Sequence, residues 1–424
     1  MTEEFLHYIW KYRLFNQDNL ISSNGEKIVI QRVGEYNSDS GPDFFNAQIK
    51  IGKTTWAGNV EIHLDSSSWN KHNHNKDNAY NNLILHVVYN NDQNNFRKNG
   101  ELIPTLELKN YFDEIIYDRY IALKNSILWI PCQNSISSVN KFTLNNWVER
   151  LLVERLERKT TSIYNSLKLN KNNWEETFYQ YLAANFGFNT NSQAFEMLAK
   201  SLPQKYIAKH KNNLFQVEAL LFGQAGMLEK KFNDEYPQKL KREYDFLKAK
   251  FSLVPLQEHL WKFFRVRPSN FPTIRIAQFA ELIYNSSKLF SKIIEMPNMK
   301  ELKKIFSVSP SSYWLTHYYF DKSSPRKTKK ISDSSVNLIL LNTVIPLVFA
   351  YSKQKDDEKL KQKILSLYEI IEGENNSVIA KWKELGIPVK TAYYTQALLE
   401  LKKQYCNNKK CLECAVGVCI LKKN

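Results

Sequence analysis

The chain has 424 residues, of which 43% are hydrophobic and 24% charged, so its composition is that of a folded globular protein and excludes a disordered one. No stretch approaches the roughly 18 apolar residues of a membrane span. The first residues lack a basic segment followed by an apolar one, so no signal peptide is expected. We therefore expect a cytoplasmic protein without membrane contact, long enough for two or three domains.

The formal net charge of +16 is unevenly distributed. Residues 1–110 carry 11 Lys and Arg against 13 Asp and Glu, whereas the remainder carries 48 against 30. A basic body suits a polyanionic partner, because Lys and Arg neutralise phosphates and release their counterions. The charge thus favours a nucleic-acid partner, and the alternative is a lysine-rich surface that binds nothing. The sequence does not indicate the oligomeric state.

The first 110 residues are predicted to form a small α/β domain. Apolar residues at helical spacing predict an opening helix over residues 3–14. Short runs rich in β-branched and aromatic residues then alternate with turns that contain Gly and Asn, which predicts strands. The expected strands cover residues 28–30, 44–51, 54–64, 83–89 and 103–108, with a short helix over 77–82.

From about residue 111 the pattern is helical. Amphipathic segments recur without a fixed period, so a solenoid is not expected. They are predicted at residues 147–159, 174–186, 192–201, 213–228, 236–251, 274–286, 335–351, 357–371 and 390–405. We expect an α+β architecture with a mixed sheet in an α/β head over 1–110, a large basic all-helical domain over 111–403 and a short Cys-rich tail over 404–424.

A pair of carboxylates stands out in the predicted sheet. Asp43, after Gly41-Pro42, stands at the entrance to one strand, and Glu61-Ile62-His63 lies inside the next. Side chains alternate along a strand, so Glu61 and His63 point to the same face, and a hairpin would bring Asp43 to them. Mg²⁺ prefers such oxygen ligands and activates a bound water. The alternative is a turn and a half-exposed strand without chemistry.

These residues resemble the motif of the PD-(D/E)XK nuclease superfamily, in which Pro-Asp precedes an acidic-x-Lys triplet within an α-β-β-β-α-β core. The resemblance implies a restriction-endonuclease-like head, with Asp43 and Glu61 as ligands of Mg²⁺ or Mn²⁺. His63 stands where the superfamily has the Lys that positions or activates the attacking water. A His there acts as a base or as a ligand that favours Mn²⁺, or it marks lost activity. Some members also use a Glu of the first helix, for which Glu3 and Glu4 are candidates.

Five of the eight histidines fall within residues 1–86. His72 and His74 follow Trp69 closely, at the mouth of the predicted sheet. They are interpreted either as a second metal or phosphate-contact group near Glu61, or as part of a hydrophilic loop. For His86 the alternative is burial within a strand.

Three arginines predict a phosphate or stacking site in the helical domain. Arg265 and Arg267 lie in a loop rigidified by two prolines, and Arg275 lies in the helix that this loop opens onto. Arginine forks, aromatic neighbours and helix N-terminal amides together suit nucleic acid. The alternative is a structural corner in which the arginines of the loop pair with acidic residues.

Four cysteines cluster in the last 19 residues, in the spacing C-x4-C-x2-C-x4-C. Cytosolic chains rarely carry disulfides, so clustered cysteines indicate metal thiolates. A Cys₄ set suits Zn²⁺ and also an iron–sulfur cluster, and the alternative is free thiols that simply pack. Cys132 is interpreted as a buried small hydrophobe. The expected ligands are Cys406, Cys411, Cys414 and Cys419.

Over its full length the chain also resembles a bacterial family described only as a domain of unknown function. The segments that carry this resemblance are residues 40–44, 58–63, 271–275 and 405–406. The expected function is therefore taken from the head: a metal-dependent nuclease that acts on DNA or RNA. The alternative is a non-catalytic nucleic-acid-binding or scaffold protein with a degenerate site. A third hypothesis, a metallohydrolase of small substrates, requires His72 or His74 within reach of Glu61.

Overall fold

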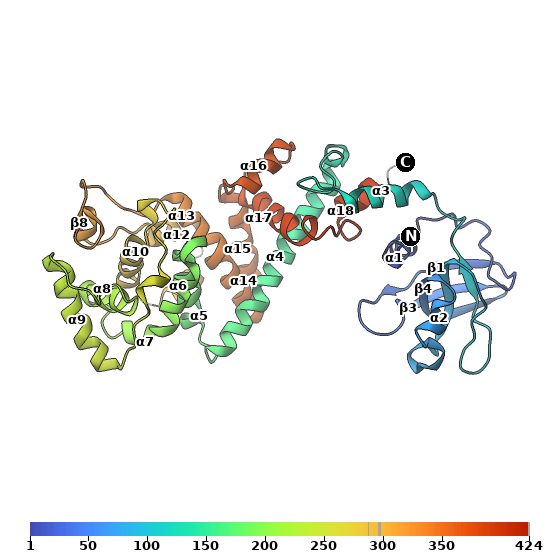
Figure 1. Cartoon of the computed structure of the whole chain (residues 1–424), viewed down its shortest axis with the longest axis horizontal. Helices are drawn as coiled ribbons and strands as arrows, with labels where there is room; N and C mark the ends of the chain where they lie inside the picture. Colours follow the sequence, from blue (N-terminus) through green and yellow to red (C-terminus); the bar gives the residue numbers. More distant parts are fainter. Residues whose placement is uncertain (287, 296–297, 423–424) are drawn as a thin grey trace. The chain divides into compact units, whose positions relative to one another are not determined.

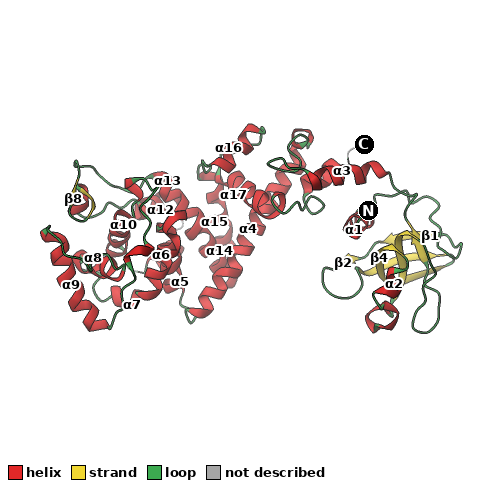
Figure 2. Ribbon diagram, viewed as in Figure 1, coloured by secondary structure: helices red, strands yellow, loops and turns green. Residues whose placement is uncertain are grey.

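The computed structural model of the chain describes residues 1–286, 288–295 and 298–422. Its contacts divide the chain into two units, of which the first comprises Met1–Trp147 with Leu401–Asn424 and the second Val148–Glu400. The large sheet belongs to the first unit, and the second is helical apart from a short hairpin (Figures 1 and 2). The expected mixed sheet at the N-terminus and large helical body are both confirmed.

The boundaries of the two units lie at other residues than the boundaries at 110 and 403 that were expected from the sequence. Tyr120 and Leu123 of α3 (Glu114–Asn125) share one hydrophobic cluster with the sheet and with Cys411. The ring of Tyr120 stacks on that of Phe5 with 5.3 Å between their centroids. By these contacts, α3 and the C-terminal segment belong to the first unit. The last two residues of the expected tail lie outside the described residues.

The sheet of the first unit has six strands in the order β1-β3-β4-β5-β6, with β2 paired to β3. Strands β1, β3 and β4 are antiparallel neighbours, whereas β5 runs parallel to β4 and β6 parallel to β5. All five expected strands occur with bounds within two residues, and β2 was not expected. The strands are β1 (Ile28–Arg32), β2 (Glu35–Tyr36), β3 (Phe44–Ile51), β4 (Thr54–Asp65), β5 (Leu83–Asn90) and β6 (Thr105–Glu107).

The opening helix α1 (Glu3–Lys11) packs against β4 and closes the core of the first unit. It begins after Thr2, whose side chain accepts the N–H of Phe5 and so caps the helix. Its apolar face is buried, and the indole of Trp10 also donates to the carbonyl of Val33 at 3.0 Å. This hydrogen bond satisfies the one polar atom of a fully buried side chain.

A short helical crossover connects β4 to β5. Parallel neighbours need such a connection, because the chain has to return to the same end of the sheet. The crossover consists of α2 (Ser68–Lys71) and two 3₁₀ turns, η1 (His74–Lys76) and η2 (Asn78–Tyr80). The turn η2 lies within the short helix that was expected over residues 77–82. The crossover also carries His72 and His74, and it therefore sets where these side chains meet the sheet.

Helices form almost all of the second unit, and α4 (Lys141–Leu169) begins in the first. Nine helices after α4 coincide with the expected amphipathic segments. They are α5 (Trp174–Phe186), α6 (Phe188–Ser201), α8 (Leu214–Gln224), α9 (Glu235–Phe251), α10 (Pro272–Asn285), α13 (Asp333–Ile339), α14 (Ile345–Gln354), α15 (Glu358–Ile370) and α17 (Ala392–Glu400). Shorter elements are α7 (Gln204–Ile207), α11 (Leu289–Glu295), α12 (Met299–Phe306), α16 (Ser377–Glu384) and the hairpin of β7 (His317–Tyr319) and β8 (Lys322–Ser323).

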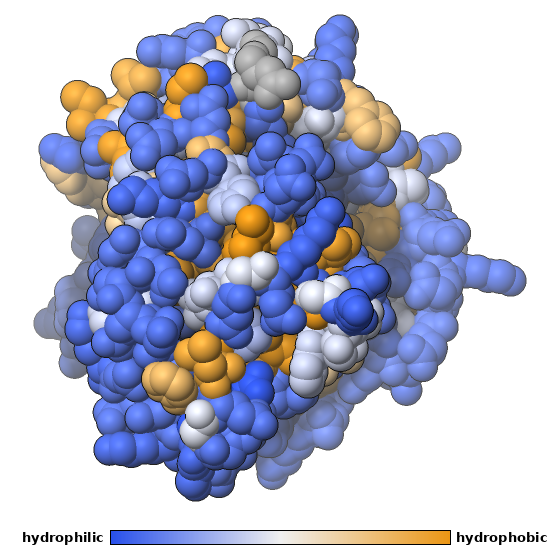
Figure 3. Space-filling model, turned by 90° about the vertical axis from the view of Figure 1, so that its right-hand side faces the viewer, coloured by the Kyte–Doolittle hydropathy of each residue, from blue (hydrophilic) through white to orange (hydrophobic). Residues whose placement is uncertain are grey.

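Among the described residues, one helical segment, Asp333–Gln354, is long and apolar enough by composition to cross a membrane. Of its 18-residue window, 72% is buried inside the protein, which is typical of a core helix in a soluble protein. The face shown in Figure 3 is largely hydrophilic, with small, separate hydrophobic spots. Both observations are consistent with the soluble protein that the sequence predicts.

Candidate functional site

Asp43 and Glu61 lie side by side on the hairpin of β3 and β4. Asp43 directly precedes β3, and Glu61 lies on β4 one residue after the pair Phe44–Val60. The backbone N–H of Asp43 donates to Glu61 Oε2 at 3.2 Å, and the N–H of Ile62 donates to Asp43 Oδ2 at 2.9 Å. The two carboxylates therefore converge as expected, and a backbone N–H holds each of them.

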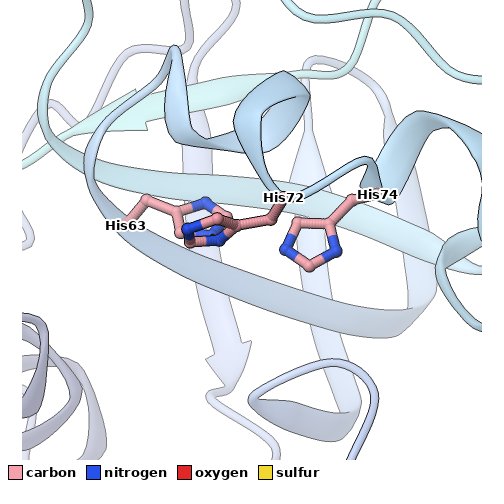
Figure 4. Close-up of side chains that lie close together, drawn as sticks. All are labelled: His63, His72 and His74. Atoms are coloured by element: carbon pink, nitrogen blue, oxygen red, sulfur yellow. The ribbon is translucent and has the colours of Figure 1, made fainter.

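Histidines from the strand and from the crossover surround Glu61. His63 Nε2 lies 3.5 Å from Glu61 Oε1, and His74 Nε2 lies 3.4 Å from the same oxygen. His72 follows α2, and its Nδ1 lies 3.3 Å from His63 Nε2. The ligand atoms of the three histidines lie within 4.8 Å of one another (Figure 4). Because His72 is exposed, this cluster reaches solvent.

His86 and Asn95 fix the orientation and the proton of His63. His86 on β5 is fully buried, and its Nε2 lies 2.9 Å from His63 Nδ1. Asn95 Nδ2 donates to the carbonyl of Ser66 at 2.6 Å and lies 3.4 Å from His86 Nδ1. Since an amide nitrogen only donates, His86 accepts at Nδ1 and donates from Nε2 to His63. His63 therefore keeps its proton on Nε2, the atom that faces Glu61.

Burial dominates the protonation of these groups. It raises the pKa of Glu61 to about 9, and the charge of Asp43 adds to the shift. Burial, followed by the charges of four neighbouring histidines, lowers the pKa of His63 to about 2. Burial and His74 lower the pKa of His86 to about 3, and burial lowers the pKa of His74 as well. At neutral pH these three histidines are neutral, and Glu61 holds a proton that a bound cation would displace.

The donor set fits a divalent ion of borderline hardness. Imidazole nitrogens together with carboxylate oxygens suit Mn²⁺, Fe²⁺ and Zn²⁺ better than an all-oxygen set does. His74 Nε2 is buried and makes no hydrogen bond to any residue that the structure describes. A buried nitrogen without a partner costs free energy, which coordination would offset. Glu61, His72 and His74 are thus placed to hold an ion, with Asp43 beside them.

Helix α1 also contributes to the site. His7 Nε2 lies 3.2 Å from Asp43 Oδ2. After burial and Asp43, the charge of Glu3 further raises the pKa of Glu61. Glu4 instead accepts a hydrogen bond of 3.1 Å from a tyrosine hydroxyl of α3. Of the two acidic candidates in the first helix, Glu3 therefore acts on the site and Glu4 contacts α3.

Sequence reasoning did not single out His7 or Asn95, and it did not connect His86 with His63. The position of His7 could have been inferred from the sequence, because Glu3 and His7 are four residues apart and therefore share one face of a helix. Asn95 lies in a loop where no period places its side chain. The register of the parallel strands, which pairs Glu61 with His86, follows only from the folded sheet.

The three arginines that were expected to bind nucleic acid differ in their surroundings. Arg275 on α10 is buried and donates to Gln278 Oε1 at 2.9 Å and to Asn270 Oδ1 at 2.6 Å. Arg265 and Arg267 are exposed, and the guanidinium of Arg265 lies over an exposed phenylalanine ring at 5.2 Å. Neither of the two is found in an ion pair among the described residues, as the structural-corner alternative would require.

Arg267 and Arg275 line one cavity of about 1140 Å³ in the second unit, and Arg265 is not among its lining residues. The cavity carries both signs of charge. Its charged lining residues are Arg267, Arg275, Lys303, Asp333, Glu372 and Glu374. Burial lowers the pKa of Arg275 to about 10, and its hydrogen-bond partners among the described residues are neutral. An anion in the cavity would therefore supply its missing counter-charge.

The cysteines of the tail lie near a fifth cysteine. Cys411 and Cys414 are buried, and Cys406 and Cys419 are half-buried. Cys132 packs against the hydrophobic cluster that contains Cys411, as expected of a small hydrophobe. However, burial and the charges of Cys414 and Cys411 raise its pKa to about 12, so Cys132 also lies close to these two thiols.

Comparison with known proteins identifies a family for the chain. The model of a family described as "protein of unknown function (DUF2851)" matches residues 3–377. No curated protein and no solved structure matches the chain. The carboxylates, the histidines and the three arginines lie inside the matched range, and the C-terminal cysteines lie beyond it.

Proposed function

Because the chain belongs to the DUF2851 family, whose description assigns no activity, we propose a function from the chemistry of the site: the protein is a metal-dependent phosphodiesterase that cleaves DNA or RNA. The observation that carries this proposal is the group of Asp43, Glu61 and His74, in which Glu61 is buried and the other two are half-buried. Two carboxylates lie there beside the imidazole of His74. Its Nε2 lies 3.4 Å from Glu61 Oε1 and makes no hydrogen bond to any described residue.

In this proposal Glu61 and His74 bind the metal ion, and Asp43 and His72 complete its surroundings. A metal ion at this position would polarise a phosphate and lower the pKa of a bound water. The imidazole ligands favour Mn²⁺ or another borderline ion over Mg²⁺. The exposed His72 lies on the solvent side, where a substrate phosphate would enter.

His63 would act as a hydrogen-bond donor. Its proton lies on Nε2, because His86 and Asn95 occupy the other end of the relay. A neutral donor at this position can hold the attacking water or a phosphate oxygen in place. It would thus supply the positioning part of the role that Lys has in the PD-(D/E)XK superfamily, without the charge.

The topology of the first unit supports the same proposal. Apart from the two-residue strand β2, which lies between β1 and β3, the first unit begins with α1, the antiparallel strands β1, β3 and β4, the helical crossover and the parallel strand β5, in the order α-β-β-β-α-β. This is the order that the resemblance to the nuclease superfamily implies. The charge of the second unit supports a nucleic-acid substrate, because residues 148–400 carry 39 Lys and Arg against 26 Asp and Glu.

The proposal is tested by cleavage assays on single- and double-stranded DNA and RNA with Mn²⁺ and with Mg²⁺. Wild type should cleave at least one of these substrates, with a preference for Mn²⁺. Glu61→Gln and Asp43→Asn should each lose about 100-fold or more, since both remove charge next to the ion. Glu101→Gln is the matched control, because Glu101 is an exposed carboxylate of the same unit. No cleavage with any metal, or equal cleavage by Glu61→Gln, would contradict the proposal.

A second candidate function is favoured by the position of His74. The hypothesis of a metallohydrolase for small substrates required His72 or His74 within reach of Glu61, and His74 Nε2 lies 3.4 Å from Glu61 Oε1. Metal-dependent hydrolysis of bis(p-nitrophenyl) phosphate without cleavage of any polynucleotide would support this function instead. Salt-sensitive binding of nucleic acid without hydrolysis would support the scaffold alternative.

A further inference from the structure

Two segments far apart in the sequence meet in the first unit and bring cysteines together. Helix α18 (Ala415–Leu421) contacts α3 and the 3₁₀ turn η3 (Ile136–Ser138), which follows Cys132 closely. The side chain of Lys402 lies over the ring of Trp129, 5.2 Å from its centroid. The loop around Cys132 and the C-terminal segment are therefore packed on each other over several residues.

Tight turns hold the C-terminal cysteines against this loop. The N–H of Lys409 donates to the carbonyl of Cys406 at 3.2 Å, and the N–H of Cys414 donates to the carbonyl of Cys411 at 3.4 Å. Gly417 of α18 approaches so closely that a Cβ atom there would collide with the carbonyl of Cys411. These turns carry the chain from Cys406 to Cys411 and hold Cys411 against α18, next to Cys414.

The four thiols influence one another electrostatically. Burial, followed by the charges of Cys414, Cys132 and Cys411, raises the pKa of Cys406. Burial and the charge of Cys414 raise the pKa of Cys411 to about 12. Burial is the largest cause of the raised pKa of each thiol, and neighbouring thiols add to it for Cys132, Cys406 and Cys411. Such thiols are costly to ionise, unless a metal takes the place of their protons.

Cys419 points away from this group. It follows Gly417 by two residues on α18, and two residues correspond to about 200° around an α-helix. Since Gly417 faces Cys411, Cys419 projects to the opposite side of the helix. Its charge does not contribute to the pKa of the other four cysteines.

We propose that Cys132, Cys406, Cys411 and Cys414 hold an iron–sulfur cluster of the [4Fe–4S] type. This inference is independent of the proposed nuclease activity. It replaces Cys419, which the spacing within the tail predicted, with a cysteine 274 positions before Cys406. The cluster would join the loop that follows α3 to the C-terminal end of the chain, and so close the first unit.

The separation of the sulfur atoms favours a cluster over a single zinc ion. Four thiolates around Zn²⁺ lie about 3.8 Å apart, because each Zn–S bond is about 2.3 Å long and the geometry is tetrahedral. Among the described residues, three histidines have ligand atoms within 4.8 Å of one another, and no three cysteines do. In a four-iron cluster each thiolate binds a different iron atom, which holds the sulfurs farther apart.

The surroundings also suit the negative charge of such a cluster. The backbone N–H groups of Gly417 and Val416 and the indole of Trp147 lie near the sulfur of Cys414 and lower its pKa against the effect of burial. The charge of Lys402 acts on Cys406, and that of Lys409 on Cys411. Hydrogen bonds to the sulfurs and nearby cations stabilise thiolates bound to iron.

The test is the metal content of the full chain purified without oxygen. Wild type should contain about four iron atoms and four acid-labile sulfides per chain and show the broad visible absorption of an iron–sulfur cluster. The variants Cys132→Ser and Cys414→Ser should each lose most of the iron. The matched control Cys419→Ser should retain it.

Several results would overturn the proposal. One is a wild-type chain with one zinc ion per chain, or with neither iron nor zinc after anaerobic reconstitution with Fe²⁺ and sulfide. Another is a loss of iron in Cys419→Ser while Cys132→Ser keeps it. The wild-type iron and sulfide content does not depend on the folding of any variant, so insoluble serine variants leave the test decisive.

Discussion

Metal binding at Glu61 should depend steeply on pH, because the ion has to displace a proton. Burial and Asp43 raise the pKa of Glu61 to about 9, and Glu3 adds to the shift. His63, which also faces this carboxylate, has its pKa lowered to about 2 and has no second proton to release at neutral pH. Burial lowers the pKa of His74 too, so the proton released between pH 7 and pH 9 comes from Glu61.

The size of this pH dependence is set by how far the pH lies below the pKa of Glu61. Each pH unit below 9 weakens the apparent affinity about tenfold, or by about 1.4 kcal/mol. Between pH 7 and pH 8.5 the Kd for Mn²⁺ should therefore fall about 25-fold, and it should level off above about pH 9. The affinity for the ion rises with pH, because binding releases a proton and a higher pH favours that release. In Glu61→Gln no proton is displaced, so the dependence on pH should disappear.

Isothermal titration of the full chain with Mn²⁺ under argon, at several values between pH 7 and pH 8.5, measures this slope. Glu101→Gln serves as the control and should keep the slope of wild type, because Glu101 is exposed. A Kd that stays constant over this range would show that metal binding displaces no proton from Glu61. A slope that persists in Glu61→Gln would show that another group releases the proton.

Three further predictions concern other parts of the chain. Burial raises the pKa of Glu218 to about 7, above the value of 4.5 for a free side chain, so wild type should lose up to about 3 kcal/mol of stability between pH 4.5 and pH 8 relative to Glu218→Gln. Urea denaturation at both pH values measures this difference, and parallel pH profiles would contradict it. If one phosphate enters the cavity, Arg275→Met should weaken the binding of a nucleic acid and reduce the slope of log K against log salt concentration by about 1. An unchanged slope in a salt titration would exclude that contact. Gly58→Ala should destabilise the first unit by about 1–3 kcal/mol in thermal denaturation, because its Cβ would lie 2.6 Å from the carbonyl of Asn82, and an unchanged Tm would show that β5 can move.

The strands of the head and the longer helices follow from local patterns. Alternating or short apolar runs bounded by Gly and Asn predicted β3 and β4 to within one residue, because β3 largely alternates between buried and exposed residues and β4 contains a continuous buried run. The same alternation placed Glu61 and His63 on one face, and the hairpin then brought Asp43 to them. These parts could be predicted because they depend on neighbours in the sequence.

Features that depend on contacts between distant segments could not be predicted. The relay from Asn95 through His86 to His63 requires the register of the parallel strands and the path of a loop. Cys132 reaches Cys406 only because the loop after α3 packs on the C-terminal segment. The amino-acid composition shows where strand-forming segments give way to helical ones, but it does not show which segments pack together.

The hairpin of the second unit illustrates another limit. No strand was expected after residue 111, yet β8 pairs with β7. A strand of two or three residues is too short to show a period, and its pairing is decided by the packing around it. The short helices α11, α12 and α16 were missed as well.

The most direct test of the central claim is a crystal structure of the full chain soaked in Mn²⁺, with anomalous diffraction to locate the ion. We expect one strong peak about 2.0–2.2 Å from both Glu61 Oε1 and His74 Nε2, with His63 left as a donor outside the coordination sphere. A crystal with occupied Mn²⁺ sites elsewhere and none at Glu61 would contradict it.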